Sequence, residues 1–377
     1  MSPRLQPAAD LDAAHLQRAV ELAGGGTGRV SPNPLVGVVV VRGADVLGEG
    51  FHAELGGVHA EVAALDDARR RGHDLAGATL YSSLEPCAHQ GRQPPCTEAI
   101  VAAGIARVVI GCDDPSPKAS GRGPGILRDE GVEVAFAGGA EATAARLLIQ
   151  PFRKHARTGR PLVVHKSALS LDGRTATAGG DSRWISGAQS RALAHRWRAE
   201  ADAVAVGIGT ALADDPLLTA REVDAHRQPT RVVFDTGARL PLSSKLLATL
   251  DQGPVIVFCG SGAPAPRAEA LREVGAEVIA LQGEGAGGVE AALEELGRRE
   301  ITSLLLEGGA TLAGSFLEAG EIDEMRLFVA PIILGGDGRP LFDSAGPDRV
   351  EVAVRPLAVA SQQSGDDILV RARLKEW

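Results

Sequence analysis

Residues 59–61 read His-Ala-Glu, and residues 83–96 read SLEPCAHQGRQPPC. The two stretches offer His59, Cys87 and Cys96, which are the nitrogen and sulfur ligands that zinc prefers. A catalytic zinc site has three protein ligands and keeps a fourth position for water, whereas a structural site usually closes with a fourth side chain. Glu61 stands in the first turn of an expected helix, where it can reach that water. The pattern predicts a catalytic zinc centre with Glu61 as its proton carrier.

Strands and helices alternate around this motif. Apolar runs predict strands and 3.6-residue periodicity predicts helices, while glycines after several runs mark where helices end. In the first half we expect strands at 35–41, 46–51, 78–83, 107–112 and 132–136, and helices at 59–71, 95–103 and 141–149.

The alternation restarts after the basic stretch 153–161, and we place a domain boundary there, giving domains 1–153 and 154–377. Continuous apolar runs predict buried strands at 162–166, 203–206, 231–234, 255–258, 278–281 and 301–306. Ser186 and Gln189 have the spacing of a capping box at the start of a helix. Strand-like runs at 325–330 and 368–374 have little helix between them, which predicts antiparallel pairing at that edge.

Composition and charge exclude several classes of protein. The chain has 377 residues, which favours two domains, and its 44% hydrophobic and 23% charged residues are typical of globular proteins. A net charge of −9 argues against sequence-independent binding of DNA or RNA. No apolar run is long enough to span a membrane, and no segment of signal-peptide type begins the chain. We therefore expect a cytoplasmic protein with a small-molecule substrate and no nucleic-acid or membrane partner.

The spacing of the two cysteines needs its own explanation. Zinc deaminases that act on nucleobases carry H-x-E and P-C-x-x-C, with the glutamate as general acid and base. The first half matches at residues 59–61, but eight residues, 88–95, separate Cys87 from Cys96. His89 and Arg92 lie within this insertion and are candidates for lining a pocket or for a solvated loop. A structural zinc closed by His89 or His52 remains a rival interpretation.

Seven motifs together resemble one family, the bifunctional deaminase/reductases of riboflavin biosynthesis. The long loop between the cysteines is that family's own form of the signature. The other matching stretches are SPNPLVG at 31–37, DPSPK at 114–118, KSALSLDGR at 166–174, SRWIS at 182–186, GTALADDP at 209–216 and EGGATLAGS at 307–315. The resemblance covers essentially the whole chain.

The resemblance implies an α/β protein with two activities. It implies a cytidine-deaminase-like three-layer α/β/α domain that uses one zinc ion, followed by a dihydrofolate-reductase-like α/β domain that uses NADPH. The first would deaminate 2,5-diamino-6-(5-phosphoribosylamino)pyrimidin-4(3H)-one by hydrolysis. The second would reduce the ribosyl group of 5-amino-6-(5-phosphoribosylamino)uracil to ribityl. A homo-oligomer, dimer or tetramer, is also implied.

The family's binding residues carry over to positions in this sequence. The implied cofactor contacts are Ala168, Trp184, Thr210, Asp214, Thr236, Gly309, Ala310, Thr311, Leu312, Ala313, Gly314 and Ser315. The implied substrate contacts are Asn33 in the deaminase and Ser182, Arg198, Leu218, Arg221 and Glu307 in the reductase. Glycines 308, 309 and 314 follow an expected strand and open a helix, where backbone N–H groups can bind a phosphate or simply form a tight turn. Arg198 and Arg221 suit a ribose phosphate because guanidinium groups bind phosphate through two hydrogen bonds.

Three rival functions fit parts of the sequence. One is a deaminase fused to a degenerate reductase domain, which would release ammonia without oxidising NADPH. A deaminase of cytidine or deoxycytidylate with a non-catalytic nucleotide-binding second domain shares the zinc motif. A zinc-stabilised nucleotide sensor without turnover would need neither Glu61 nor an open ligand position.

Overall fold

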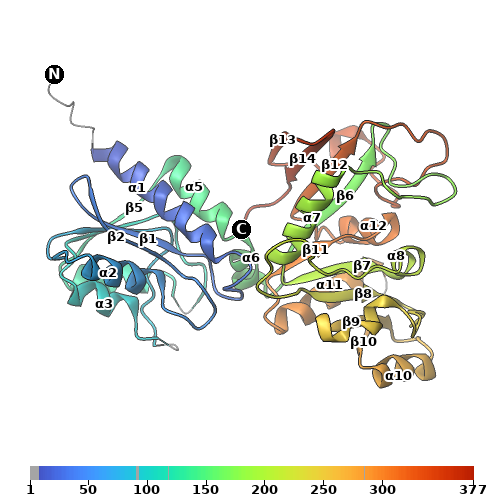
Figure 1. Ribbon diagram of the computed structural model, residues 1–377, viewed down its shortest axis with the longest axis horizontal. Helices are drawn as coiled ribbons and strands as arrows, with labels where there is room; N and C mark the ends of the chain where they lie inside the picture. The colour runs from blue at the N-terminus through green and yellow to red at the C-terminus, as the bar shows by residue number, and fades with distance from the viewer. Residues whose placement is uncertain (1–7, 91–92, 118, 284) are drawn as a thin grey trace. The chain divides into compact units, whose positions relative to one another are not determined.

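The computed structural model describes residues 8–90, 93–117, 119–283 and 285–377, which form two compact units (Figure 1). The first unit ends at Thr158 and also includes Trp377, and the second comprises Gly159–Glu376. The boundary predicted after residue 153 falls inside helix α6 (Gln150–Thr158). The basic stretch at which we placed the boundary thus includes the charged end of a helix, which has the same sequence pattern as a boundary. The assignment of one function to each predicted domain stays a prediction.

The first unit is a five-stranded sheet between two helical layers. Its strand order is β2-β1-β3-β4-β5, with β1 antiparallel to both of its neighbours and β3, β4 and β5 parallel. Figure 1 draws α1 and α5 on one face of the sheet and α2 and α3 on the other. The strands are β1 (Gly37–Arg42), β2 (Asp45–Phe51), β3 (Thr79–Ser82), β4 (Arg107–Ile110) and β5 (Glu133–Phe136). The helices are α1 (Ala8–Ala23), α2 (Ala60–Arg70), α3 (Cys96–Ala102), α4 (Arg122–Asp129), α5 (Gly139–Leu148) and α6.

Close packing of α2 on the sheet fixes the position of the zinc motif. Gly50 on β2 lies so near this helix that a Cβ atom there would come within 2.4 Å of the Ala64 backbone nitrogen. Leu65 on α2 and Leu80 on β3 are fully buried in the same apolar cluster. Because the helix is held against the strands along this face, its first turn, which carries Glu61, has a defined place.

The second unit is built on a nine-stranded sheet with the order β10-β9-β8-β7-β11-β6-β12-β14-β13. Its strands are β6 (Leu162–Ser170), β7 (Ala203–Gly207), β8 (Thr230–Phe234), β9 (Val255–Gly260), β10 (Glu277–Leu281), β11 (Ser303–Leu306), β12 (Glu324–Ala330), β13 (Ala358–Ser364) and β14 (Asp367–Arg373). Its helices are α7 (Ala188–Glu200), α8 (Ile208–Asp214), α9 (Lys245–Ala248), α10 (Ala265–Val274), α11 (Gly285–Arg298) and α12 (Ala310–Glu318).

Strands β6 to β12 of this sheet run parallel, and β14 pairs antiparallel with both β12 and β13. The antiparallel edge predicted from the sequence is confirmed. On one face Phe316 of α12 and Leu293 of α11 are fully buried against the central strands. On α7, Trp197 stacks on Phe328 of β12 with ring centroids 5.3 Å apart.

The predicted capping box is wrong. Helix α7 begins at Ala188 with Gly187 as its N-cap, and no side chain caps it. The Gly187 N–H group instead donates a 2.8 Å hydrogen bond to the Asp367 carboxylate. A residue distant in the sequence thus accepts a hydrogen bond from the start of the helix, where Ser186 and Gln189 were expected to do so.

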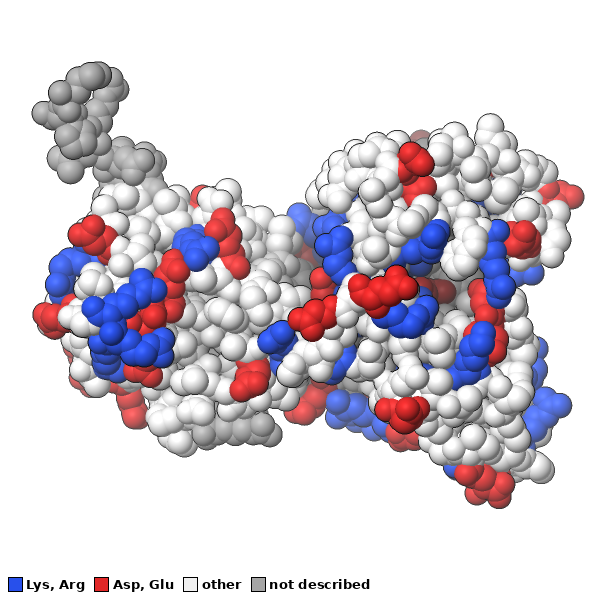
Figure 2. All heavy atoms as spheres, viewed as in Figure 1, with Lys and Arg blue, Asp and Glu red and all other residues white. Residues whose placement is uncertain are grey.

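On the face drawn in Figure 2, Lys and Arg side chains lie among Asp and Glu side chains instead of forming one basic band. Across the described ranges, no helix combines the length and the apolarity that crossing a membrane requires.

Candidate active sites

Three ligand atoms converge where α2 and α3 begin. His59 is the N-cap of α2, Cys96 is the first residue of α3, and Cys87 lies in the loop before α3. The His59 Nδ1 atom lies 3.2 Å from the Cys96 sulfur and 3.5 Å from the Cys87 sulfur, and all three atoms lie within 4.8 Å of one another. Tetrahedral bonds of about 2.0–2.3 Å place zinc ligands about 3.3–3.8 Å apart. The donor set and its spacing therefore fit zinc.

The rival structural zinc site is not favoured. Within the described part of the chain, this cluster contains no fourth His, Cys, Asp or Glu, and neither His52 nor His89 joins it. The His52 Nε2 atom instead lies 3.2 Å from the amide nitrogen of Asn33, while its Nδ1 atom lies 3.0 Å from the Val58 carbonyl oxygen. His52 thus orients Asn33 beside the cluster, and a zinc ion held by these three ligands would have one coordination position left for water.

Glu61 lies beside the cluster as a buried carboxyl group, only 4% exposed. Burial, followed by the negative charge of Cys87, raises the pKa of Glu61 to about 7. A hydrogen bond from the Cys96 thiol lowers the pKa of Cys87, and the same bond, together with burial, raises the pKa of Cys96. A carboxyl group in this environment can both accept and return a proton near neutral pH.

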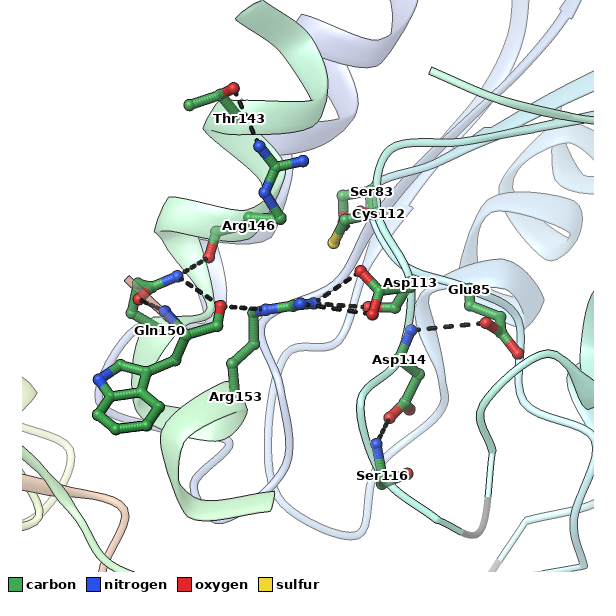
Figure 3. Close-up of polar contacts among 11 residues, drawn as sticks. Ser83, Glu85, Cys112, Asp113, Asp114, Ser116, Thr143, Arg146, Gln150 and Arg153 are labelled. Atoms are coloured by element: carbon green, nitrogen blue, oxygen red, sulfur yellow. Dashed lines mark hydrogen bonds and ion pairs between the residues drawn. The ribbon is translucent and has the colours of Figure 1, made fainter. Parts of the chain in front are cut away.

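The loop after β4 is tied to the segment that carries Cys87 (Figure 3). Buried Glu85 accepts a hydrogen bond of 3.5 Å from the Asp114 N–H group. Arg153, which is 2% exposed, donates to both the carbonyl and the carboxylate oxygens of Asp113 at 2.8 and 3.1 Å. A Cβ atom on Gly123 would lie 2.0 Å from the Pro86 carbonyl oxygen, so only glycine lets α4 pack this closely. These contacts hold in place the segment that carries Cys87.

A second candidate site lies in the other unit, at the carboxyl ends of its parallel strands. A cavity of about 650 Å³ runs along the ends of β11, β7, β8, β9 and β10. Helices α8 and α12 begin at its wall, and the α12 N-cap is Gly309. Ligands of open parallel sheets bind at this edge, and a helix N-terminus favours a phosphate. The volume is within the usual range for cofactor pockets, so the site fits a dinucleotide.

A buried ion cluster lies beside this cavity at the end of β11. Glu307 accepts two hydrogen bonds from Arg198, at 2.6 and 2.8 Å, and a third from the Lys166 ammonium at 3.3 Å. Burial raises the pKa of Glu307, but the charges of Arg198 and Lys166 outweigh it and hold the pKa well below the usual value. A third Arg198 N–H group donates to the Thr219 carbonyl at 3.2 Å, while the Thr219 hydroxyl accepts from Arg221 at 3.1 Å.

The structure brings only some of the expected cofactor residues together. Thr210, Thr236 and five residues of the segment 309–315 line the cavity, namely Gly309, Ala310, Thr311, Leu312 and Ser315. Ala313 and Gly314 are buried in α12. Among the described residues, the cavity wall does not include Ala168 on β6, Asp214 at the end of α8, or Trp184, which is 74% exposed and lies 4.6 Å from the Arg191 guanidinium. Contacts of these three residues with a cofactor stay predictions.

The expected substrate residues differ in what they can still bind. Within the described ranges, the Arg198 guanidinium donates three hydrogen bonds to Glu307 and Thr219, whereas the exposed Arg221 guanidinium donates one, to Thr219. Leu218 is 2% exposed beside them, and half-buried Ser182 lies in the loop that precedes α7. Asn33 lies in the first unit against His52, and Arg92 falls outside the described residues.

Sequence reasoning missed three residues at these sites: Lys166, Arg239 and Arg339. Lys166 stands two residues before Ala168 on β6 and therefore on the same face of the sheet, but the strand expected from the sequence ended at residue 166 and did not reach Ala168. Arg239 and Arg339 line the cavity but lie in irregular segments, where no periodicity indicates what a side chain faces.

Two family models match the chain in tandem. Residues 10–112 match the cytidine and deoxycytidylate deaminase zinc-binding region, and residues 161–370 match the RibD C-terminal domain.

Full-length relatives share the same arrangement. The riboflavin biosynthesis protein RibD of Aquifex aeolicus is 39% identical, over 96% of this chain and 98% of its own length. The Escherichia coli protein of the same name is 38% identical, over 90% and 93%. Among solved structures, Acinetobacter baumannii RibD superposes with a TM-score of 0.86 at 38% identity, covering 98% of this chain and all of that one. A Thermotoga maritima diaminohydroxyphosphoribosylaminopyrimidine deaminase/5-amino-6-(5-phosphoribosylamino)uracil reductase gives 0.85 at 36% identity, covering 98% of this chain and all of its own.

Proposed function

This chain belongs to the RibD family of bifunctional riboflavin biosynthesis deaminase/reductases, and from that premise we propose which of its residues perform each reaction. The Thermotoga maritima relative is named for a diaminohydroxyphosphoribosylaminopyrimidine and for 5-amino-6-(5-phosphoribosylamino)uracil. We assign the deamination of the first compound to the unit with the zinc cluster and the reduction of the second to the unit with the cavity. The observation that carries the assignment is a buried Glu61 beside three zinc-type ligands in one unit, and a helix N-terminus opening into a cavity in the other.

In the deaminase, His59, Cys87 and Cys96 hold one zinc ion, which lowers the pKa of water to about 7 when bound. Glu61 accepts one proton from the attacking water and passes it to the ring nitrogen, and it then carries the proton of the new hydroxyl group to the departing amine. Ammonia leaves as the carbon–nitrogen bond breaks, and a carbonyl oxygen replaces the amino group. The His52 contact holds the Asn33 amide in place to bind the ring.

In the reductase, NADPH supplies the hydride and the chain orients the reactants. The N-terminus of α12 holds the pyrophosphate, together with the residues of this segment that line the cavity, Gly309, Ala310, Thr311, Leu312 and Ser315. The Arg221 guanidinium donates one hydrogen bond to the described part of the unit, at Thr219, and its other N–H groups bind the ribose phosphate. Arg198 and Lys166 hold Glu307 ionised, and the carboxylate accepts hydrogen bonds from the sugar hydroxyls.

A two-step assay tests the assignment. The zinc-loaded protein is incubated with the diaminopyrimidinone phosphate while ammonia is measured, and NADPH is then added while its absorbance is followed. We expect ammonia first and NADPH oxidation only after deamination. Absence of ammonia would refute the deaminase assignment, and ammonia without NADPH oxidation would favour the rival in which the second domain is non-catalytic.

We propose that the chain forms homo-oligomers through the edge of its larger sheet. Strand β13 ends that sheet, and six of its seven residues are exposed. Val350, Val352, Val354 and Leu357 precede it and are between 61% and 81% exposed, and Val359 on the strand is 61% exposed. An unpaired edge with exposed apolar side chains favours pairing with a second copy of the chain.

A further inference from the structure

The cavity of the second unit has two ends with different chemistry. The N-termini of α8 and α12 open at its middle, next to the ends of β7 and β11. On the β6 side of β11 lies the cluster of Lys166, Glu307 and Arg198. In the other direction the wall follows the ends of β8, β9 and β10, and it includes Thr236 and Leu281. If the pyrophosphate lies at the helix N-termini, as proposed above, the nicotinamide reaches toward the ion cluster and the adenosine lies over β8 to β10.

Two basic side chains line this cavity among the described residues, and they belong to different ends. Arg339 pairs through its backbone with Ala176, and its guanidinium lies against Gly180, so it belongs with the segments that follow β6 and β12. Arg239 follows β8 by five residues and stands in the same turn as Thr236. The adenosine end therefore has Arg239 as its basic group.

The Arg239 guanidinium is exposed and weakly engaged. Its side chain is 54% exposed, and its ion pair with Asp235 is a loose one, with 3.7 Å between its Nε atom and the Asp235 Oδ1 atom. Asp235 is enclosed: its side chain is 0% exposed, and its Oδ2 atom accepts a 2.7 Å hydrogen bond from the Leu240 N–H group. The carboxylate holds the turn through the Leu240 N–H group, and its charge attracts the guanidinium from 3.7 Å without a hydrogen bond, so the terminal nitrogens stay available.

This arrangement distinguishes the two nicotinamide cofactors. In dinucleotide-binding folds, an accessible carboxylate after a neighbouring strand accepts the ribose 2′-hydroxyl of NADH, whereas a nearby arginine accommodates the 2′-phosphate of NADPH. Here the carboxylate at the end of β8 is buried, and an arginine is exposed in its place. We propose that Arg239, positioned by Asp235, binds the 2′-phosphate of NADPH and sets the preference for NADPH over NADH. The proposal rests on the assignment of this cavity to the cofactor.

The test uses the full-length protein and two fragments of the cofactor, 2′,5′-ADP and 5′-AMP, with binding measured by titration calorimetry. Since hydrogen bonds to a charged group contribute about 1.5–3 kcal/mol, Arg239→Ala should weaken 2′,5′-ADP binding by about tenfold to a hundredfold. It should leave 5′-AMP binding within about twofold, which also shows that the variant is folded. Arg239→Lys keeps the charge but loses the planar fork, so an intermediate loss is expected.

Arg272→Ala is the matched control, because Arg272 is a similarly exposed arginine of the same unit that pairs with Glu269 and does not line the cavity. It should bind both fragments as the unchanged protein does. If Arg239→Ala keeps the full preference for 2′,5′-ADP, the role of Arg239 is wrong, while the assignment of the cavity to the cofactor still stands. Failure of the unchanged protein to bind either fragment or NADPH would overturn the cofactor assignment together with this inference.

Discussion

Replacing Arg198 by methionine should destabilise the second unit and stop reduction while leaving deamination intact. The change removes two hydrogen bonds of 2.6 and 2.8 Å to a carboxylate that is only 8% exposed. Breaking one partner of a buried ion pair costs about 3–5 kcal/mol, because the remaining charge is left without compensation. Lys166 still lies 3.3 Å from Glu307, so we expect a loss near the lower limit, about 3 kcal/mol.

A second substitution separates the loss of the ion pair from the loss of packing. In Arg198→Met combined with Glu307→Gln, no buried carboxylate remains, so the double variant should be more stable than Arg198→Met alone. Its reductase activity should still be absent, because the carboxylate that binds the substrate has gone. Arg196→Met is the matched control, since Arg196 lies on the same helix but is exposed.

Unfolding is measured by urea titration with pulsed hydrogen exchange on peptides from α7 and β11, which reports the second unit separately from the first. Ammonia release serves as an internal standard for intact protein in every sample. The reasoning fails if Arg198→Met loses less than about 1 kcal/mol. It also fails if the second substitution lowers the stability further.

Three further predictions concern other parts of the chain. Glu61→Gln should lower ammonia release by about 10²–10⁴-fold while one zinc ion stays bound by elemental analysis, and full activity would show that another group moves the proton. His165 is fully buried, neither ring nitrogen has a partner, and burial and then Lys166 lower its pKa to about 4. The neutral ring therefore stabilises the fold above its unfolded pKa of about 6.5, and the stability falls by about 2 kcal/mol from about pH 7 to about pH 5. His165→Leu should lose less over this interval in urea titrations, and an equal loss in both proteins would exclude His165 as the cause. Val359→Lys at the β13 edge should reduce the mass measured by light scattering to that of one chain, 38.9 kDa, and an unchanged oligomer would place the interface elsewhere.

The zinc cluster was predictable because its chemistry is local in the sequence. Its ligands fall between residues 59 and 96, and each stands at the start of a helix or beside prolines in a turn. Ligand type, spacing and a neighbouring Glu61 together left few alternatives. The long loop between Cys87 and Cys96, a misfit to the general signature, was the pointer to the family.

The reductase site was less accessible to prediction because it is assembled from distant residues. Lys166 and Glu307 are 141 positions apart, and no local pattern shows that they meet. From the sequence we expected Arg198 to bind a phosphate. That expectation did not include the two hydrogen bonds that its guanidinium donates to Glu307. Strand β13 escaped detection because its exposed polar residues have no apolar alternation to mark it. The predicted end of β6 at residue 166 was four residues short, because pairing with β12 continues through Ser170.

The position of β11 in the larger sheet has a consequence for synthesis on the ribosome. This strand lies between β6 and β7, although the chain makes it after β10. Until residue 306 has emerged, β6 and β7 therefore lack the partner that joins them, and their inner edges are unpaired. The five strands of the smaller sheet are complete at Phe136. The zinc-binding unit can thus begin to fold during translation, while the cofactor cavity forms among the last features of the nascent protein.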